Sequence, residues 1–258
     1  MTQPLIELKN IHKQFDGQEV LKGVDLSIYR GETLAIIGKS GTGKSVLLKH
    51  IIGLLDPDRG AIHIQGEPAE EMAIEQRRAF LRKLSYMFQD NALFDFYTIY
   101  ENIALPLKED PGFPAGQIAG KVGRRIKQLG LSGSENKFPA QISGGMRKRV
   151  ALARALVTDP EVVLFDEPTT GLDPVRKKNV YSMIRQYQEK FGFTSVIVSH
   201  DIPQIFYISQ RIAMLDEGRI RFAGPREDVL QSHNTILNAF ISGIEPSLDQ
   251  ASKRKEDE

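Results

Sequence analysis

Two hydrophobic patterns alternate along most of the chain. Residues 33–37, 84–88, 161–166 and 194–199 form short apolar runs with few polar interruptions, which is typical of strands buried on both faces of a parallel sheet. Between these runs, apolar residues recur at helical spacing and predict helices. The predicted helices cover residues 46–52, 73–84, 118–131, 147–158, 175–190 and 225–240. We therefore expect an α/β fold.

A different pattern is found near both ends of the chain. Residues 5–10 and 20–29 alternate apolar and polar side chains, as antiparallel strands do, and Asp16-Gly17 is the predicted turn between them. Residues 211–223 have a similar pattern and predict a hairpin. An antiparallel β region is therefore expected at the N-terminus.

The first stretch with recognisable chemistry is a glycine-rich turn at residues 38–45, which fits the pattern G-x-x-x-x-G-K-[ST] between a strand and a helix. Glycines let the backbone wrap tightly, so consecutive N–H groups point into one concavity that suits a polyphosphate. Lys44 is expected to reach the β- and γ-phosphates, and the Ser45 hydroxyl to hold Mg²⁺. The alternative is a glycine-rich turn with a surface lysine. The predicted nucleotide-binding residues here are Gly38, Ser40, Gly41, Thr42, Gly43, Lys44, Ser45 and Val46.

Polar residues follow three of the apolar runs, at the strand ends where open α/β sheets bind ligands. We expect Asp166 to bind Mg²⁺ and Glu167 to polarise the water that attacks the γ-phosphate. Gln89 is expected to coordinate Mg²⁺ or this water, and His200 to contact the γ-phosphate and orient the water. The structural alternatives are a cap or turn for the carboxylates, a solvated loop residue for Gln89 and a structural role for His200.

Three further segments each allow two interpretations. Ser143-Gly144-Gly145 begins a predicted helix, where a hydroxyl and free N–H groups bind anions, or where the glycines form only a flexible cap. Phe15 ends the first strand and either stacks on a purine or belongs to the core. Residues 92–98 are apolar and aromatic, and form either a core segment or a docking groove for a partner.

Composition limits the classes of protein that need to be considered. The chain has 258 residues, 41% hydrophobic and 26% charged, and a formal net charge of +1. It is long enough for one large domain or a domain with a subdomain, and its charge suggests neither nucleic acid nor an acidic substrate as a partner. The absence of cysteine excludes disulfides and cysteine-based metal sites. Since no apolar run approaches the ~18 residues of a membrane span, we expect a cytoplasmic protein that can still lie against a membrane protein.

Together these residues resemble the nucleotide-binding subunit of an ABC transporter over about residues 5–235. The shared features, in the family's order and spacing, are the loop at 38–45, Gln89, the signature at 142–146, the strand at 162–167, Gly171-Leu172-Asp173 and His200. The resemblance implies a P-loop NTPase with a RecA-like core, a parallel sheet, an N-terminal antiparallel β subdomain and an inserted α-helical subdomain at about 90–158. It also implies one nucleotide-binding domain over residues 1–245 and a charged, frayed tail at 246–258. By position, Phe15 becomes the residue that stacks on adenine, and Asp173 a further nucleotide contact.

The signature departs from the family's usual Leu-Ser-Gly-Gly-Gln, because Ile142 and Met146 replace its first and last residues. Met146, together with residues 88–95 and 101–107, resembles the Mla branch, the ATPases of bacterial phospholipid transporters that maintain outer-membrane lipid asymmetry. This resemblance implies a peripheral ATPase on the cytoplasmic side of the inner membrane. Its implied partners are an MlaE-type permease, an MCE-domain protein of the MlaD type and a STAS-domain protein of the MlaB type. The alternative is the ATPase of an importer of amino acids or other small solutes.

The family's mechanism implies two copies of the chain, since the signature of one copy binds the ATP held by the other. Two ATP molecules would then lie between Lys44 of one chain and Ser143 of its partner, and hydrolysis would let the dimer open. Other classes fit less well. A translation factor of this type would have two phosphate loops, a chromosome-organising ATPase would need a long heptad insertion, and a kinase or GTPase would lack the Ser-Gly-Gly signature.

Overall fold

A six-stranded sheet forms the centre of the protein, which is described by a computed structural model at residues 3–88, 92–202, 204–231 and 235–242. Its strand order is β10-β9-β3-β8-β7-β6, and only β10 runs antiparallel to its neighbour. The strands are β3 (Thr33–Ile37), β6 (Leu84–Met87), β7 (Val162–Asp166), β8 (Thr194–Ser199), β9 (Arg211–Asp216) and β10 (Arg219–Pro225). Every residue of β3 and β8 is buried, as their continuous apolar sequences predict.

A second, antiparallel sheet is built mainly from the N-terminal part of the chain. Its order is β2-β1-β4-β5, and its strands are β1 (Ile6–Phe15), β2 (Gln18–Ile28), β4 (Arg59–Ile64) and β5 (Glu67–Pro68). Asp16 and Gly17 connect β1 to β2 with φ angles of 48° and 80°, and two left-handed residues are what a tight hairpin requires. The predicted antiparallel β region and its turn are confirmed.

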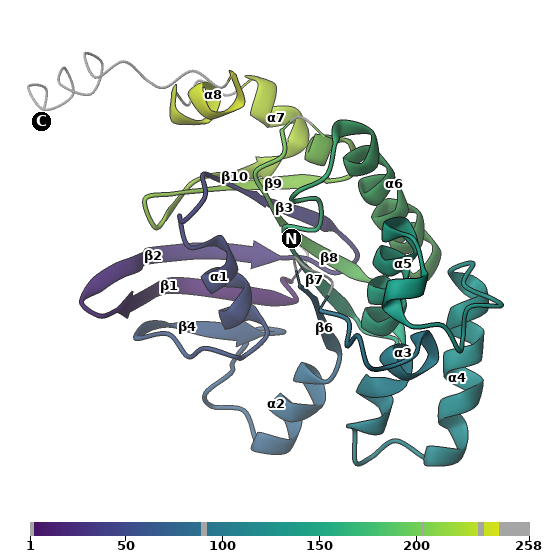
Figure 1. Cartoon of the computed structure of the whole chain (residues 1–258). Coiled ribbons are helices and arrows are strands. Elements are labelled where there is room, and N and C mark those ends of the chain that lie inside the picture. The colour runs from purple at the N-terminus through teal and green to yellow at the C-terminus, as the bar shows by residue number, and fades with distance from the viewer. Residues whose placement is uncertain (1–2, 89–91, 203, 232–234, 243–258) are drawn as a thin grey trace, which may run out of the picture.

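Eight helices lie in the described part of the chain (Figure 1). They are α1 (Lys44–Ile51), α2 (Ile74–Leu81), α3 (Ile99–Lys108), α4 (Ala115–Gln128), α5 (Gly144–Leu156), α6 (Pro174–Phe191), α7 (Arg226–Gln231) and α8 (Thr235–Ser242). Helices α3, α4 and α5 pack against one another at one side of the molecule, and α4 is the outermost of the three in Figure 1. They follow β6 and precede β7, where an inserted helical region was expected.

Alternate residues of the central strands face two separate cores. Ala35 and Ile37 belong to a core shared with α3–α6, while Leu34 and Ile36 belong to a core shared with α1 and the antiparallel sheet. Because side chains alternate along a strand, one strand supplies both cores. Both faces of the sheet are therefore covered by apolar cores, and the polar residues of the predicted site lie at the ends of the strands.

Several predicted helices differ from the observed ones. Helix α4 begins three residues before the predicted start at 118, and α5 begins at Gly144 because the Ser143 hydroxyl accepts a hydrogen bond from the Met146 N–H at 3.3 Å. The helix predicted over 225–240 begins one residue later, because Pro225 ends β10; α7 and α8 follow, and residues 232–234 between them lie outside the described residues. Helix α3 was not predicted, and it begins at a capping box in which Thr98 and Glu101 bond each other's backbone N–H groups. The tail at 246–258 lies outside the described residues.

Candidate active site

The phosphate loop joins β3 to α1 in a conformation that requires glycine. A Cβ atom added to Gly38 would lie 2.2 Å from the Leu215 carbonyl oxygen, too close for any side chain. Gly43 has a φ of 98°, and its added Cβ would lie 3.0 Å from Val20 Cγ1. The backbone of the loop can therefore approach its neighbours and turn only because these positions carry no side chain.

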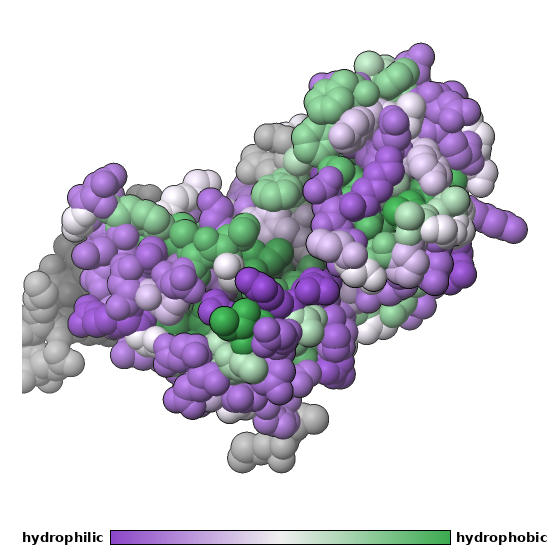
Figure 2. Space-filling view, turned by 90° about the horizontal axis from the view of Figure 1, so that it is seen from below, coloured by the Kyte–Doolittle hydropathy of each residue, from purple (hydrophilic) through white to green (hydrophobic). Residues whose placement is uncertain are grey.

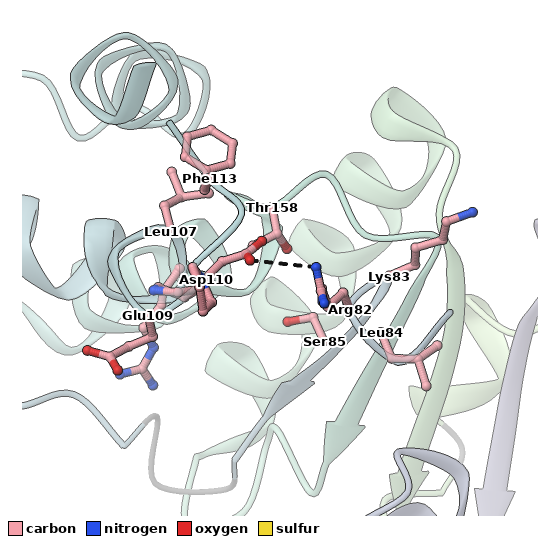
Figure 3. A pocket seen from close by; sticks show the side chains of 12 residues that line it. Arg82, Lys83, Leu84, Ser85, Leu107, Glu109, Asp110, Phe113 and Thr158 are labelled. Carbon is pink, nitrogen blue, oxygen red and sulfur yellow. Dashed lines mark ion pairs between the residues drawn. The ribbon is translucent and has the colours of Figure 1, made fainter. Parts of the chain in front are cut away.

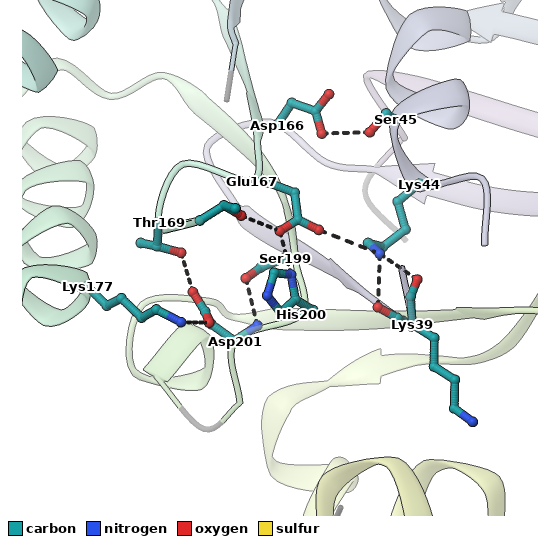
Figure 4. Close-up of polar contacts among 12 residues, drawn as sticks. Lys39, Lys44, Ser45, Asp166, Glu167, Thr169, Lys177, Ser199, His200 and Asp201 are labelled. Atoms are coloured by element: carbon teal, nitrogen blue, oxygen red, sulfur yellow. Dashed lines mark hydrogen bonds and ion pairs between the residues drawn. The ribbon is translucent and has the colours of Figure 1, made fainter. Parts of the chain in front are cut away.

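Lys44 is buried inside the turn that it ends. Its ammonium group donates hydrogen bonds to the carbonyl oxygens of Gly38 at 2.9 Å and Lys39 at 2.7 Å (Figure 4). The ammonium nitrogen lies 3.6 Å from Glu167 Oε1. Burial lowers the pKa of Lys44, and the nearby carboxylates of Glu167 and Asp166 oppose this shift. A cation thus occupies the concavity in which the backbone N–H groups were predicted to bind phosphate.

Ser45 and Asp166, the two described residues that the sequence predicts as Mg²⁺ ligands, meet beside the loop. The Ser45 hydroxyl donates to Asp166 Oδ1 at 2.8 Å (Figure 4). The Tyr86 hydroxyl donates to Asp166 Oδ2 at 2.6 Å. Hydroxyl and carboxylate oxygens are the ligands that Mg²⁺ prefers. No group of three or more His, Asp or Glu side chains that could hold a metal occurs among the described residues. The donor set therefore fits an Mg²⁺ ion that takes its other ligands from phosphates and water. Gln89, the other predicted metal ligand, lies outside the described residues.

Glu167 directly follows β7 and has an unusual backbone conformation. Its φ is 48° although it is not glycine, and its N–H donates to the Val198 carbonyl oxygen at 3.1 Å. Its carboxylate Oε2 lies 2.5 Å from His200 Nδ1 and accepts a hydrogen bond from the Thr170 hydroxyl at 2.8 Å (Figure 4). Left-handed backbone at such a residue is sparsely populated and is frequent at functional sites. The structure thus brings Glu167, His200 and Lys44 together at the strand ends.

A buried polar network lies behind His200 and was not predicted. Asp201 accepts hydrogen bonds from Thr169 and Lys177 through different carboxylate oxygens. The Tyr181 hydroxyl connects this network to Ser199 at 2.7 Å. The partners come from the segment after β7, the end of β8 and helix α6. The signal in the sequence was an aspartate directly after His200, but its partners are distant along the chain.

The remaining predicted site residues lie on the surface of the chain. Ser143 caps α5, and Gly144 and Gly145 form its exposed first turn. Asp173 caps α6 and accepts a hydrogen bond from the Arg176 N–H at 3.0 Å. Phe15 is 41% exposed at the end of β1. In the described part of this single chain, no hydrogen bond or ion pair joins these residues to Lys44.

Comparison with known proteins identifies the family. The family model described as ABC transporter matches residues 21–170, which is more than half of the chain. The chain is 39% identical over 238 residues to the probable ribonucleotide transport ATP-binding protein mkl of Mycobacterium leprae, covering 92% of this chain and 69% of that protein. It is 36% identical over 249 residues to the methionine import ATP-binding protein MetN of Brucella abortus, covering 93% of this chain and 67% of that protein. The chain thus spans about two thirds of the length of these relatives.

Two solved structures have the same fold. One is cbiO1 from Clostridium perfringens, described as part of the ABC transporter complex cbiONQ, with a TM-score of 0.80, 27% identity and coverage of 99% of this chain and 100% of that chain. The other is a dimeric post-hydrolysis state of the ATP-binding cassette MJ0796 bound to ADP and Pi, with a TM-score of 0.72, 30% identity and coverage of 86% and 98%. The predicted α/β fold of an ABC ATPase is confirmed. The chain belongs to the ABC transporter family, as an ATP-binding domain that hydrolyses ATP.

Proposed function

We propose that the chain is the ATPase subunit of a bacterial inner-membrane transporter of phospholipids, which maintains the lipid asymmetry of the outer membrane. The observation that carries the ATPase part is the convergence of Lys44, Ser45, Asp166, Glu167 and His200 at one edge of the sheet. The lipid part rests on the resemblance of the signature and its neighbouring segments to the Mla branch, together with 39% identity to an mkl protein.

The triphosphate of ATP binds in the loop at residues 38–45, where Lys44 exchanges its two carbonyl partners for the β- and γ-phosphates. Ser45 and Asp166 hold the Mg²⁺ of the nucleotide, together with Gln89. When bound, this ion neutralises the charge that develops on the phosphates. Phe15 is exposed enough to stack on the adenine ring.

Glu167 is the general base for the attacking water. Its carboxylate is held on one side by His200 and Thr170 and faces Lys44 on the other. A base that is fixed before the substrate arrives takes a proton without first reorganising. His200 orients the same water and contacts the γ-phosphate.

Two copies of the chain complete each site. Ser143, Gly144 and Gly145 present a hydroxyl and helix N–H groups at an exposed surface. This is an anion-binding arrangement, and no anionic side chain bonds to it within the described residues of the same chain. A second chain that faces this surface with its phosphate loop would supply that anion. A homodimer is supported by the dimeric state of MJ0796 with ADP and Pi.

The permease binds where the helical region meets the sheet. Phe94, Phe96 and Tyr97 form a cluster of touching rings in which Phe96 is 70% exposed. Leu93 packs against the core instead, so both interpretations of residues 92–98 apply to part of the segment. Exposed aromatic clusters are typical of interaction sites. Figure 2 shows apolar side chains along a hollow between two lobes of the molecule.

A cavity of about 510 Å³ adjoins this aromatic segment (Figure 3). Arg154 lines the cavity and donates to the carbonyl oxygen of Ala92 at 2.8 Å, which connects the cavity to the segment before Phe94. Phe113 and the Arg82–Asp110 ion pair also line the cavity (Figure 3). The proposed partners here are an MlaE-type permease, with an MCE-domain protein and a STAS-domain protein in the same complex.

The part of the chain that the structure describes contains no helix both long and apolar enough to span a bilayer. From the resemblance to the Mla branch, the proposed location is peripheral, on the cytoplasmic side of the inner membrane. The second candidate function is the import of an amino acid or another small solute, which is favoured by the 36% identity to MetN.

Reconstitution with the membrane partners distinguishes the two functions. The complex would be purified with the chain, and its bound small molecules identified by mass spectrometry after solvent extraction. Phospholipid in the complex, together with ATPase activity that rises with added phospholipid, is expected. Activity that responds to methionine or another amino acid, without bound lipid, would favour the importer.

A further inference from the structure

The Tyr86 hydroxyl donates a hydrogen bond to Asp166, the last residue of β7. Tyr86 lies on β6, and β6 pairs in parallel with β7. Its hydroxyl reaches Asp166 Oδ2 at 2.6 Å, while its ring packs against Phe88 with the centroids 4.6 Å apart. Hydrogen bonds from a hydroxyl to a carboxylate at this distance are among the strong ones.

The two oxygens of Asp166 thus have different partners, Ser45 on Oδ1 and Tyr86 on Oδ2. The last torsion of an aspartate side chain is broad and soft, so one hydrogen bond leaves the carboxylate plane free to rotate. A second bond, from a different strand, fixes that plane.

We propose that Tyr86 is a positioning residue that sets the affinity of the nucleotide site for Mg²⁺ by fixing the orientation of the Asp166 carboxylate. The inference rests on the proposed role of Asp166 as a magnesium residue. Partners of a metal ligand orient it, and their loss typically weakens metal binding about 10–100-fold. Tyr86 itself binds neither the nucleotide nor the ion.

The test measures the dissociation constant of a fluorescent ATP analogue twice, once in EDTA and once in excess Mg²⁺. The value in EDTA divided by the value in Mg²⁺ is the ratio that is compared between variants. This ratio reports how strongly the ion and the nucleotide support each other's binding. In Tyr86→Phe, the ring and its contact with Phe88 remain. We expect unchanged affinity in EDTA and a ratio about 10-fold lower than in the wild type.

Tyr187→Phe is the matched control. Tyr187 is a buried tyrosine of α6 that stacks on Phe191, and in the described part of the chain no hydrogen bond joins it to Asp166, so its variant should have the wild-type ratio. Thermal unfolding of both variants checks that they fold. A wild-type ratio in a folded Tyr86→Phe would overturn the inference, and so would an equal loss of affinity with and without Mg²⁺.

Asp166→Asn separates this inference from the proposed function. If the ratio falls in both Asp166→Asn and Tyr86→Phe, the proposed function and the inference are both supported. If it falls only in Asp166→Asn, the inference alone fails. If Asp166→Asn keeps the wild-type ratio, the magnesium role of Asp166 fails, and the inference that rests on it fails as well.

Discussion

At the scale of single residues, the site depends on charged side chains whose orientations are fixed by their neighbours. Glu167 has a left-handed backbone and three side-chain neighbours, Lys44, Thr170 and His200. Each neighbour comes from a different segment, so the carboxylate is held in place before ATP binds. This preorganisation is what a general base requires.

Replacing Glu167 by Gln tests this role. The amide keeps the size of the side chain and a hydrogen-bonding oxygen but cannot accept the proton of water at neutral pH. We expect turnover of ATP to fall about 10²–10⁴-fold, with ATP binding retained. Phosphate release and nucleotide binding would be measured on the same preparation, and unchanged hydrolysis would remove Glu167 from the base role.

The buried Asp201 supports the site through its own partners. Burial raises its pKa, but hydrogen bonds from Lys177 and Thr169 and the charge of Lys177 lower it more, so the pKa of Asp201 lies below its ordinary value of 3.8. A group with a lowered pKa in the folded state stabilises the protein above its unfolded pKa. That stability is lost as the pH falls from about 4 through the folded pKa.

Asp201→Asn is therefore expected to lower the free energy of unfolding at pH 7 by about 1–3 kcal/mol, because a charge-assisted hydrogen bond is lost. The difference from the wild type should shrink as the pH falls below about 4, because the carboxylate of the unfolded chain is protonated there and that of the folded chain follows at its lower pKa. Urea unfolding at several pH values measures this. A difference that stays constant down to pH 3 would show that the charge of Asp201 contributes nothing.

At the scale of elements, α3 and the segment before it connect the site to the surface. β6 leads from Tyr86 toward Gln89, and the aromatic cluster follows within a few residues. Asn102 of α3 fixes this segment to the helix, because its side-chain amide donates to the carbonyl oxygens of Phe94, Tyr97 and Thr98 at 3.0 Å. The backbone around Phe96 is therefore fixed to α3, and a partner that binds Phe96 contacts a segment that is held in place by hydrogen bonds.

Phe96→Asp is expected to uncouple the permease, since it places a charge on a side chain that is 70% exposed in the isolated chain. ATP binding by the isolated chain should not change. Leu93→Asp also puts a charge in this segment, but Leu93 packs against the core, so this variant is expected to lose stability as well. Normal transport by Phe96→Asp in the reconstituted complex would argue against docking at this cluster.

At the scale of the whole molecule, the sequence predicted the parts that depend on local pattern. The apolar runs predicted the central strands because both faces of the sheet are covered, and the glycine motif predicted the phosphate loop because its conformation excludes side chains. Helix α3 was missed because Pro106 lies within it and its apolar residues are mixed with the preceding aromatic segment. The bonds of Tyr86 and Lys177 were missed because each joins segments that only the fold brings together.

The exposed signature makes a prediction about assembly. Gly145 has open space around its Cβ position, so Gly145→Asp fits the folded chain. The new carboxylate would repel the γ-phosphate of a facing chain. We expect normal folding and ATP binding by the monomer, but no ATP-dependent dimer.

Two chains are proposed to enclose ATP and to separate after hydrolysis, which requires Glu167. The most direct test is the molecular mass of the Glu167→Gln variant in solution. Light scattering after gel filtration should give about 28.9 kDa without nucleotide and about twice that mass with ATP and Mg²⁺. The double variant Glu167→Gln/Gly145→Asp should remain at the monomer mass in both conditions. A Glu167→Gln chain that binds ATP but stays monomeric, alone and beside its permease, would contradict the account.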